Sequence, residues 1–512
     1  MKRALAAVAL LLAASASACS VPSPTPPAVT PPAGPTAPAP PAEPPPALGT
    51  NGAAVPVLGW APCHGGFRCA AAAVPLSYRD PHGPQLTLSV VELPATDPAH
   101  RIGSLFFNYG GPGADGVGEL TRFGSRYPPE LRARFDLVSF DPRGIGGSAP
   151  IHCPGAEDVR PGGSPLRPEQ SAAFWSAGAA PGRACAAGTG AELAHLSTAN
   201  VARDLDLLRQ AVGDRELNYY GYSYGTYLGG TYANLFPGRL RAMTLDGTLD
   251  LVANSTGRPG QEHEPVDVRA DVAAAQQEEL EQFFAACTAA GAPKCAFAGG
   301  DPKAKFAAVF ARLSHGPVGG VTTASLMETI QSALYQTGRW KRLGQTLAAL
   351  VPSAPVARTP VLDPYVPVHS TGFLAVQCLD SELPRRTADY PPLAAAQEQR
   401  QPYFGLAPVF SLAQCVDWPV RDEDRYTGPW NRPRAHPVLV LNNRYDPATP
   451  LSDAHATAAE LGDGKVLVVD GSGHTSLNGP SACASAAVVR YFTDLLPPAD
   501  GATCAPDTVP FP

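Results

Sequence analysis

An apolar strand, a tight turn and a helix are expected in immediate succession over residues 216–235, and this succession constrains the fold more than any other feature. The turn, residues 221–225, reads GYSYG and has the Gly-x-Ser-x-Gly pattern. Such a pattern often arises by chance, and an ordinary glycine-rich turn is the alternative. Between a strand and a helix, however, it is typical of a nucleophile elbow, whose glycines avoid clashes in a very tight turn. The sequence therefore predicts that Ser223 stands at a sheet edge, at a helix N-terminus.

Further strands and helices alternate on both sides of this turn. Strands are expected at 85–93, 103–109, 135–140, 240–245, 437–441 and 465–469, and helices at 198–212, 452–461 and 481–495. Alternation of this kind indicates an α/β fold with a largely parallel sheet and helices on both faces.

The strand pattern is lost over residues 251–430, where helices such as 272–290 and 324–335 are expected. A helical insertion before the last strands would form a lid over the sheet edge at which ligands bind in such folds. We therefore divide the folded chain into a first core part at 56–250, a lid at 251–430 and a second core part at 431–512.

The N-terminus has the features of an export signal. Lys2 and Arg3 precede a short apolar run at 4–14, and small residues lead to Cys19. This pattern predicts a cleavable signal peptide at 1–18. Cys19 directly after small residues is similar to a bacterial lipobox, so we expect it to be lipidated; an ordinary cleavage site is the alternative. The protein would then be exported, either held at the cell envelope or secreted.

Residues 19–55 are predicted to form a lipid-anchored, proline-rich stalk. Of the 58 prolines, 13 lie between Pro22 and Pro46, and bulky side chains are almost absent there. Prolines hold such a segment extended, and it has too little apolar surface to fold. A proline-rich ligand for a partner protein is the less favoured interpretation.

Charge and cysteine content restrict the partners. A net charge of −7 gives no indication of a basic surface for nucleic acid. After the N-terminus there is no apolar run long enough to predict a membrane span, so the lipid anchor is the expected contact with a membrane.

Apart from Cys19 there are ten cysteines, an even number that suggests five disulfides in an exported chain. Metal-ligand spacings are absent from the sequence, so neither a metal nor a cofactor is expected. Nearest-neighbour pairing is the expected connectivity: Cys63–Cys69, Cys153–Cys185, Cys287–Cys295, Cys378–Cys415 and Cys483–Cys504.

A serine nucleophile needs a base and an acid that orients the base. In elbow enzymes these follow the serine in the order acid, then histidine. Asp446 ends the strand VLVLNNRYD and His474 follows the strand KVLVVDGSGH, so both are expected at the same sheet edge as Ser223. Asp246 also ends a strand and His455 also follows Asp446. We interpret Asp246 as structural and His455 as a surface residue of a helix.

The glycine-rich segment after the strand 103–109 has two interpretations. Gly111-x-Gly113-x-x-Gly116, followed by Asp141 at a later strand end, matches a dinucleotide-binding fingerprint. The favoured alternative is an oxyanion loop, in which the N–H groups of Gly111 and Tyr224 point at the reacting carbonyl.

Several motifs occur together in order, and their combination resembles one enzyme family. They are GGPG at 110–113, DPRGIGGS at 141–148, GYSYG at 221–225, DPATP at 446–450 and GSGH at 471–474. The set resembles the proline iminopeptidase branch of the α/β-hydrolases, and the paired cysteines and long lid resemble actinobacterial secreted tripeptidyl aminopeptidases. The resemblance implies an exported serine exopeptidase that releases short peptides from free N-termini through an acyl-enzyme. One departure is Asn108-Tyr109, where iminopeptidases carry histidine before the glycines.

A lid over the catalytic edge would prevent a long peptide from passing through the site, so only the end of a peptide chain could enter. The family resemblance implies that this is the N-terminal end. A free α-amine is cationic, so its pocket requires acidic or polar acceptors. Asp380 and Glu382 beside Cys378 are the favoured candidates, whereas Glu278 and Glu281 are expected on a solvated helix face. A secreted esterase or lipase with the same triad is the alternative within enzymes. A non-catalytic binding protein on the same fold is the less favoured alternative outside them.

Overall fold

The computed structural model describes residues 49–156, 171–351 and 371–512. The chain divides into two units, Met1–Pro45 and Pro46–Pro512, and every described residue belongs to the second. The predicted signal peptide, Cys19 and the stalk up to residue 48 lie outside the described residues. The last residues assigned to the stalk contact the core, because Asn51 donates a hydrogen bond to the carbonyl of Tyr78 and Ala53 is buried.

A ten-stranded sheet runs through the unit in the order β1-β2-β3-β5-β4-β6-β7-β8-β9-β10. Strands β3 to β9 include all those expected from the sequence, whereas the sequence analysis missed β1, β2 and β10. Pairing is antiparallel from β1 to β5 and parallel from β5 to β10, so the sheet is largely parallel, as expected. The strands are β1 (Ala61–Cys63), β2 (Phe67–Pro75), β3 (Gln85–Leu93), β4 (Gly103–Asn108), β5 (Phe135–Phe140), β6 (Leu217–Tyr222), β7 (Leu240–Asp246), β8 (Leu439–Tyr445), β9 (Lys465–Ser472) and β10 (Ala502–Cys504).

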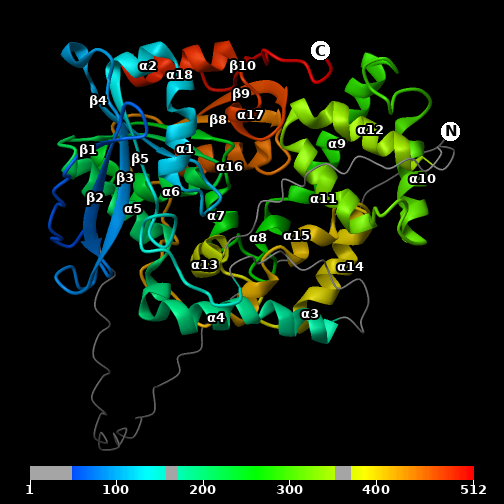
Figure 1. Cartoon of the computed structure of the whole chain (residues 1–512), viewed down its shortest axis with the longest axis horizontal. Coiled ribbons are helices and arrows are strands. Elements are labelled where there is room, and N and C mark those ends of the chain that lie inside the picture. Colours follow the sequence, from blue (N-terminus) through cyan, green and yellow to red (C-terminus); the bar gives the residue numbers. More distant parts are fainter. Residues whose placement is uncertain (1–48, 157–170, 352–370) are drawn as a thin grey trace, which may run out of the picture. The chain divides into compact units, whose positions relative to one another are not determined.

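Helices cover both faces of the sheet, because successive strand residues point to opposite sides. On β8, Val440 packs with α5 (Thr198–Ala211), α6 (Tyr224–Leu235) and α16 (Leu451–Leu461). The next residue, Leu441, packs in the opposite layer with α1 (Gly116–Phe123), α2 (Pro129–Arg134) and α18 (Ala482–Asp494). Figure 1 shows these layers around the strands.

The chain reverses its direction of travel across the sheet between β4 and β6. From β4 it crosses to β5 on one side, and it returns to β6 on the other. The carboxyl ends of β4 and β6 therefore form a topological switch point, where α/β sheets bind ligands. This is the edge at which Ser223 follows β6.

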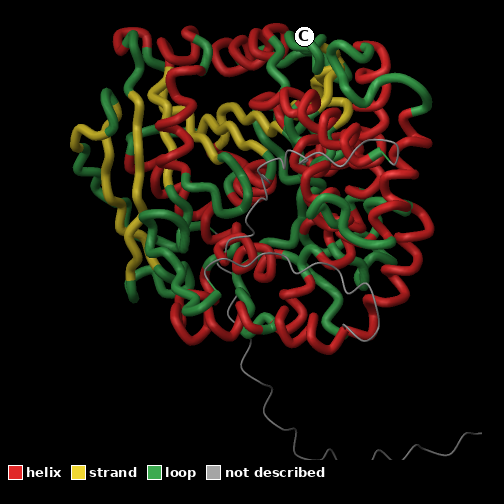
Figure 2. The backbone as a smooth tube through the Cα atoms, turned by 45° about the vertical axis from the view of Figure 1, so that its right-hand side comes forward, coloured by secondary structure: helices red, strands yellow, loops and turns green. Residues whose placement is uncertain are grey.

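The described residues between β7 and β8 form helices and loops and no strand (Figure 2), as expected for the lid. Its own apolar core includes Phe283, Ile330 and Trp340. The helices are α7 (Leu251–Asn254), α8 (Val266–Arg269), α9 (Val272–Ala290), α10 (Pro302–Ser314), α11 (Thr323–Leu334), α12 (Trp340–Leu350), α13 (Thr371–Asp380), α14 (Tyr390–Arg400) and α15 (Leu406–Phe410). Of the described helices, none is both long and apolar enough to cross a bilayer.

Two helices that precede the lid in sequence contribute to it in space. In α3 (Ser171–Gly178), Phe174 stacks edge-on against Phe410 of α15, and Cys185 of α4 (Ala180–Thr189) packs in one cluster with Cys378 and Cys415. The helices of the predicted lid therefore pack against two helices that lie outside 251–430. The sequence missed this because residues 171–189 are rich in alanine and glycine and carry little helical periodicity.

Five disulfides join nearest neighbours along the chain, which confirms the predicted connectivity. They are Cys63–Cys69, Cys153–Cys185, Cys287–Cys295, Cys378–Cys415 and Cys483–Cys504. The Cys378–Cys415 bridge ties α13 to the short helix Ala413–Asp417.

Candidate active site

Ser223 occupies a strained turn between β6 and α6. Its φ of 53° and ψ of −126° lie outside the regions that L-residues usually adopt, and strain of this kind concentrates at functional sites. A Cβ on Gly221 would lie 2.3 Å from the carbonyl oxygen of Gly225, so only glycine fits there. Between Leu217 and Asn234, Ser223 is the one residue that is not buried. The local sequence thus exposes this serine and fixes its backbone.

Asp446 and His474 form a buried pair at the ends of β8 and β9. The imidazole Nδ1 lies 2.9 Å from both carboxylate oxygens of Asp446. Oδ1 also accepts the N–H groups of Ala448 and Thr449, each at 2.9 Å, and Oδ2 accepts that of Thr475 at 3.2 Å. These donors leave the carboxylate a single orientation. His474 is 7 % exposed, so the residue is largely shielded from solvent.

The turn after β7 brings Ser223 and His474 to one place. The Ser223 N–H donates to the Asp246 carbonyl at 2.9 Å. At the next residue, Gly247, an added Cβ would lie 3.2 Å from Cε1 of His474. The serine backbone and the imidazole edge therefore flank the same dipeptide, although 251 positions separate them in the sequence.

The loop after β4 lies directly against Ser223. A Cβ on Gly110 would be 2.9 Å from Cβ of Ser223 and 3.1 Å from the backbone nitrogen of Tyr224. Gly110 and Gly111 have φ of 84° and 101°, so this close approach uses a conformation that favours glycine. In the part of the chain that the structure describes, the N–H groups of Gly111 and Tyr224 donate no hydrogen bond. Both are available to an oxyanion.

The side chain of Asn108 takes part in shaping this loop. Its Oδ1 accepts the N–H of Gly110 at 3.0 Å, and it lies 2.9 Å from where a Cβ on Gly225 would be. The Asn108 side chain therefore supports the turn from within, through an acceptor two residues before Gly110.

The competing acid, Asp246, lies beside the same loop but bonds other groups, and the competing base, His455, lies on the surface. Asp246 is fully buried and accepts the N–H of Ser476 at 3.0 Å and the Tyr220 hydroxyl at 2.9 Å, beside the Ser476 hydroxyl. Burial raises the pKa of Asp246 to about 6. His455 is exposed on α16. Neither residue is hydrogen-bonded to His474.

The glycine-rich segment that matches the dinucleotide fingerprint leads into α1, and the Asp141 carboxylate already occupies the N-terminus of this helix. Asp141 accepts the N–H of Val117 at 2.9 Å and that of Gly147 at 2.8 Å. A pyrophosphate requires the free N–H groups of such a terminus and no carboxylate in its place. This arrangement favours the oxyanion interpretation of the loop.

Asp380 and Glu382 lie at the junction of α13 with α5. Asp380 is 2 % exposed and accepts the N–H of Thr198 at 2.9 Å and its hydroxyl at 2.5 Å. The same hydroxyl contacts the hydroxyl of Tyr224, the residue after Ser223. Burial raises the pKa of Asp380 to about 7. Glu382 is 44 % exposed and pairs with Arg425 at 2.6 Å. The two carboxyl groups are therefore in different environments.

The acidic residues of α9 divide between surface and interior. Glu278 is exposed and Glu281 pairs with Lys303 at 3.1 Å, as expected for a solvated face. Glu279, which the sequence analysis did not single out, is fully buried, and its Oε1 accepts the N–H of Gly473 at 3.0 Å. The signal that could have found it is its place among apolar positions of the helix.

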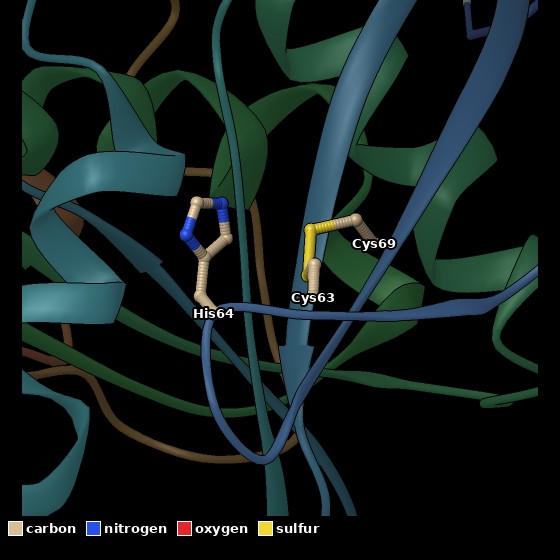
Figure 3. Close-up of side chains that lie close together, drawn as sticks. All are labelled: Cys63, His64 and Cys69. Atoms are coloured by element: carbon tan, nitrogen blue, oxygen red, sulfur yellow. A yellow bond between two sulfur atoms is a disulfide. The ribbon is translucent and has the colours of Figure 1, made fainter.

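One group of metal-type side chains is present among the described residues, and Figure 3 shows it. Cys63 and Cys69 are joined in a disulfide, and His64 stands beside them. Sulfur atoms in a disulfide offer no thiolate to a metal. The cluster is therefore a disulfide that joins the antiparallel strands β1 and β2.

A strained serine at the β6 elbow, a buried carboxylate–imidazole pair and a glycine-rich loop on a largely parallel sheet define an α/β-hydrolase. Residues 104–292 match the family model described as alpha/beta hydrolase fold, and residues 401–504 match the model described as TAP-like protein.

Curated relatives match along most of the chain. Serine protease Hip1 of Mycobacterium tuberculosis is 31 % identical, over 87 % of this chain and 90 % of that protein. Tripeptidyl aminopeptidase of Streptomyces lividans is 27 % identical, over 87 % and 85 %, and carboxylesterase B of Mycobacterium tuberculosis is 31 % identical, over 86 % of each. The chain belongs to the tripeptidyl aminopeptidase-like family of α/β-hydrolases, and it is a serine hydrolase.

Proposed function

We propose that the protein is an exported serine exopeptidase in which Ser223, His474 and Asp446 are the catalytic triad. The observation that carries the proposal is the pairing of Asp446 with His474 beside the dipeptide that also holds Ser223. A hydroxyl is a poor nucleophile without a base, and the base works only in one tautomer. Asp446 at Nδ1 fixes that tautomer and leaves Nε2 for the serine.

In the proposed reaction, Nε2 of His474 takes the proton of the Ser223 hydroxyl while Oγ bonds to the scissile carbonyl carbon. The carbonyl oxygen becomes an oxyanion, which the N–H groups of Gly111 and Tyr224 stabilise. The tetrahedral intermediate expels the amine, which takes the proton from His474, and leaves an acyl-enzyme. Water then attacks the ester carbon while His474 takes its proton; the bond from the acyl carbon to Oγ breaks, the acid is released, and His474 returns the proton to Ser223.

Peptides are the proposed substrates, because two relatives that match most of the chain are named a serine protease and a tripeptidyl aminopeptidase. A secreted esterase is the second candidate, since the relative named carboxylesterase B is equally similar at 31 % identity. The triad serves amides and esters alike. Substrate choice therefore depends on the pocket rather than on the reacting groups.

We propose further that the substrate enters with a free N-terminus, which is recognised near Asp380 and Glu382. The supporting observation is that Asp380 is buried with only the neutral donors of Thr198 as hydrogen-bond partners, and that burial and, to a smaller extent, Asp422 raise its pKa, although Arg425 opposes the rise. A substrate ammonium beside it would stabilise the charged carboxylate further. The Thr198 hydroxyl, which donates to Asp380, also contacts the hydroxyl of Tyr224, whose backbone N–H is one of the two proposed oxyanion donors.

For localisation, we propose a signal peptide at 1–18, a lipid anchor on Cys19 and a stalk that carries the hydrolase core and the lid away from the membrane. The five disulfides support the export part of this proposal, because such bonds persist in oxidising compartments. Metabolic labelling with an alkyne fatty acid, compared between wild type and Cys19→Ala, tests the anchor.

The function is tested with Ser223→Ala and His474→Ala. Each is expected to lower kcat by roughly 10⁴-fold or more while circular dichroism stays native, because nucleophile and base act as one unit. Substrates are matched free and N-acetylated peptide amides and a short ester. Near-native turnover in either variant would disprove the triad. Equal cleavage of free and acetylated peptides would disprove the amine pocket, and preference for the ester would favour the esterase.

Asp380→Asn and Glu382→Gln separate amine recognition from a structural role. If these carboxyl groups bind the amine, KM rises for free-amine peptides and stays unchanged for the ester. If Asp380 only caps α5, kcat or stability changes for every substrate alike.

A further inference from the structure

The loop that carries His474 is held by the lid as well as by the core. The N–H of Gly473 donates to Oε1 of Glu279 on α9 at 3.0 Å, and the N–H of His474 donates to the carbonyl of Tyr335 at the end of α11 at 3.0 Å. Both acceptors belong to the lid. They accept hydrogen bonds from the N–H groups of two successive residues, and the second of these is His474, the proposed base.

The core supplies the complementary contacts. The carbonyl of Gly473 accepts from the side-chain amide of Asn443 on β8 at 2.7 Å, and Nδ1 of His474 lies 2.9 Å from Asp446. Each of the two loop residues is thus hydrogen-bonded to both the lid and the core. The geometry of the imidazole depends on both parts of the molecule being in place.

The fit between the lid and this loop is close. The ring of Tyr335 meets the ring of His474 edge to face, with centroids 5.0 Å apart. A Cβ on Gly473, whose φ is 95°, would lie 3.1 Å from the Tyr335 carbonyl oxygen, so a side chain there would push the lid away. Glycine at this position therefore allows the lid to close on the loop.

Glu279 is suited to hold the loop without competing with Asp446. Its side chain is fully buried, and burial raises its pKa well above that of an ordinary glutamate, with a further contribution from Asp446. Hydrogen bonds from Ser472 and Gly473 oppose this rise. Its Oε1 accepts the Gly473 N–H, whereas Asp446 accepts from the imidazole, so the two carboxyl groups bind different groups of the loop.

We propose that Glu279 is a positioning residue which, together with the Tyr335 carbonyl, makes the alignment of His474 conditional on the docked lid. This inference rests on the proposed role of His474 as the base. Glu279 acts through the Gly473–His474 backbone and does not touch the reacting atoms. Loss of the acceptor would let the imidazole shift, and a misplacement of about 1 Å costs roughly 10²-fold in rate.

The test compares Glu279→Leu, which removes the acceptor at similar volume, with Glu279→Gln, which keeps a carbonyl oxygen in the same place. Glu281→Gln, on the solvated face of the same helix, is the matched control. We expect kcat to fall by about 10- to 100-fold in Glu279→Leu, equally on a free-amine peptide and on a small ester. KM should stay within about twofold, Glu279→Gln should recover most of the rate, and Glu281→Gln should match wild type.

Active-site titration with a fluorophosphonate counts competent molecules, so kcat is expressed per competent site. Three results would overturn the proposal: wild-type kcat per site in Glu279→Leu, an equal loss in Glu279→Gln, or a rise in KM confined to free-amine peptides. The last would make Glu279 part of the substrate pocket. If Ser223→Ala or His474→Ala keeps its activity, the proposed function itself fails. If both are inactive and Glu279→Leu turns over normally, only the positioning role fails.

Discussion

Asp246 accepts the backbone N–H of Ser476 at 3.0 Å, two residues beyond His474, while the imidazole itself bonds Asp446. Two buried aspartates at neighbouring strand ends thus serve one loop in different ways. Asp446 contacts the ring, and Asp246 anchors the peptide chain that follows it. Their substitutions should separate an effect on the chemistry from an effect on stability.

Asp446→Asn is expected to lower kcat by about 10⁴-fold, because the amide no longer fixes the imidazole tautomer that the reaction needs. Asp246→Asn is expected to lower kcat by less than about tenfold and to destabilise the fold by about 1–3 kcal/mol, because one of its buried donors loses an acceptor. Steady-state kinetics and urea unfolding of both variants measure the two effects. A larger loss of kcat in Asp246→Asn would show that our choice of acid is wrong.

Gly110→Ala is expected to abolish most activity. The new Cβ would lie 2.5 Å from the Tyr222 carbonyl oxygen and 2.9 Å from Cβ of Ser223, in a backbone conformation with φ of 84°. The loop and the elbow would have to separate, which moves the proposed oxyanion donors by an amount that costs roughly 10²-fold or more in kcat.

Gly238→Ala is the matched control for this variant, since nothing lies within 4 Å of its added Cβ. Its kcat should equal that of wild type. Normal turnover in Gly110→Ala with an intact fold would contradict the placement of the oxyanion donors beside this loop.

Asp380 should make stability depend on pH. Burial raises its pKa from 3.8 to about 7, so the folded state holds a proton that the unfolded state releases above about pH 4. Its contribution to stability is therefore complete below pH 4 and is lost as pH rises through 7. Between these limits the loss amounts to about 4 kcal/mol at most. Asp380→Asn removes this contribution, so the stability difference between variant and wild type should move in favour of the variant from pH 4.5 to pH 8.

Urea unfolding of both proteins at those two pH values measures this difference. Glu382→Gln is the control, because Glu382 is exposed and paired with Arg425. A constant difference between Asp380→Asn and wild type across this range would mean that the Asp380 carboxyl titrates as an ordinary aspartate.

The disulfides should contribute according to the loops they close. In the chain-entropy picture, Cys378–Cys415, with a separation of 37 residues, stabilises by about 4 kcal/mol, and Cys63–Cys69, with a separation of 6, by about 2 kcal/mol. Paired alanine substitutions and urea unfolding give both values. Mild reduction without denaturant should open Cys63–Cys69 before Cys378–Cys415, because both cysteines of the latter are buried. Earlier labelling of Cys378 would contradict this order.

Local patterns in the sequence were sufficient for the elbow and for the parallel strands except β10, and they placed the three residues of the proposed triad after strand ends. This worked because a strand end fixes where the next residue emerges, and the carboxyl ends of parallel strands share one edge. Ser223, Asp446 and His474 each follow such a strand. The nearest-neighbour disulfides were also predicted, since short loops bring their cysteines together without knowledge of the fold.

Contacts between distant segments were decided only by the tertiary structure. The place of Glu279 among apolar helix positions indicates that it is buried, but nothing local identifies its partner Gly473, which lies 194 positions away. Asp380 likewise meets Thr198 across 182 positions. Periodicity states which face of a helix is apolar, but not which loop that face covers. The docking of the lid on the His474 loop results from contacts between surfaces formed by distant segments, and no single stretch of sequence contains both of them.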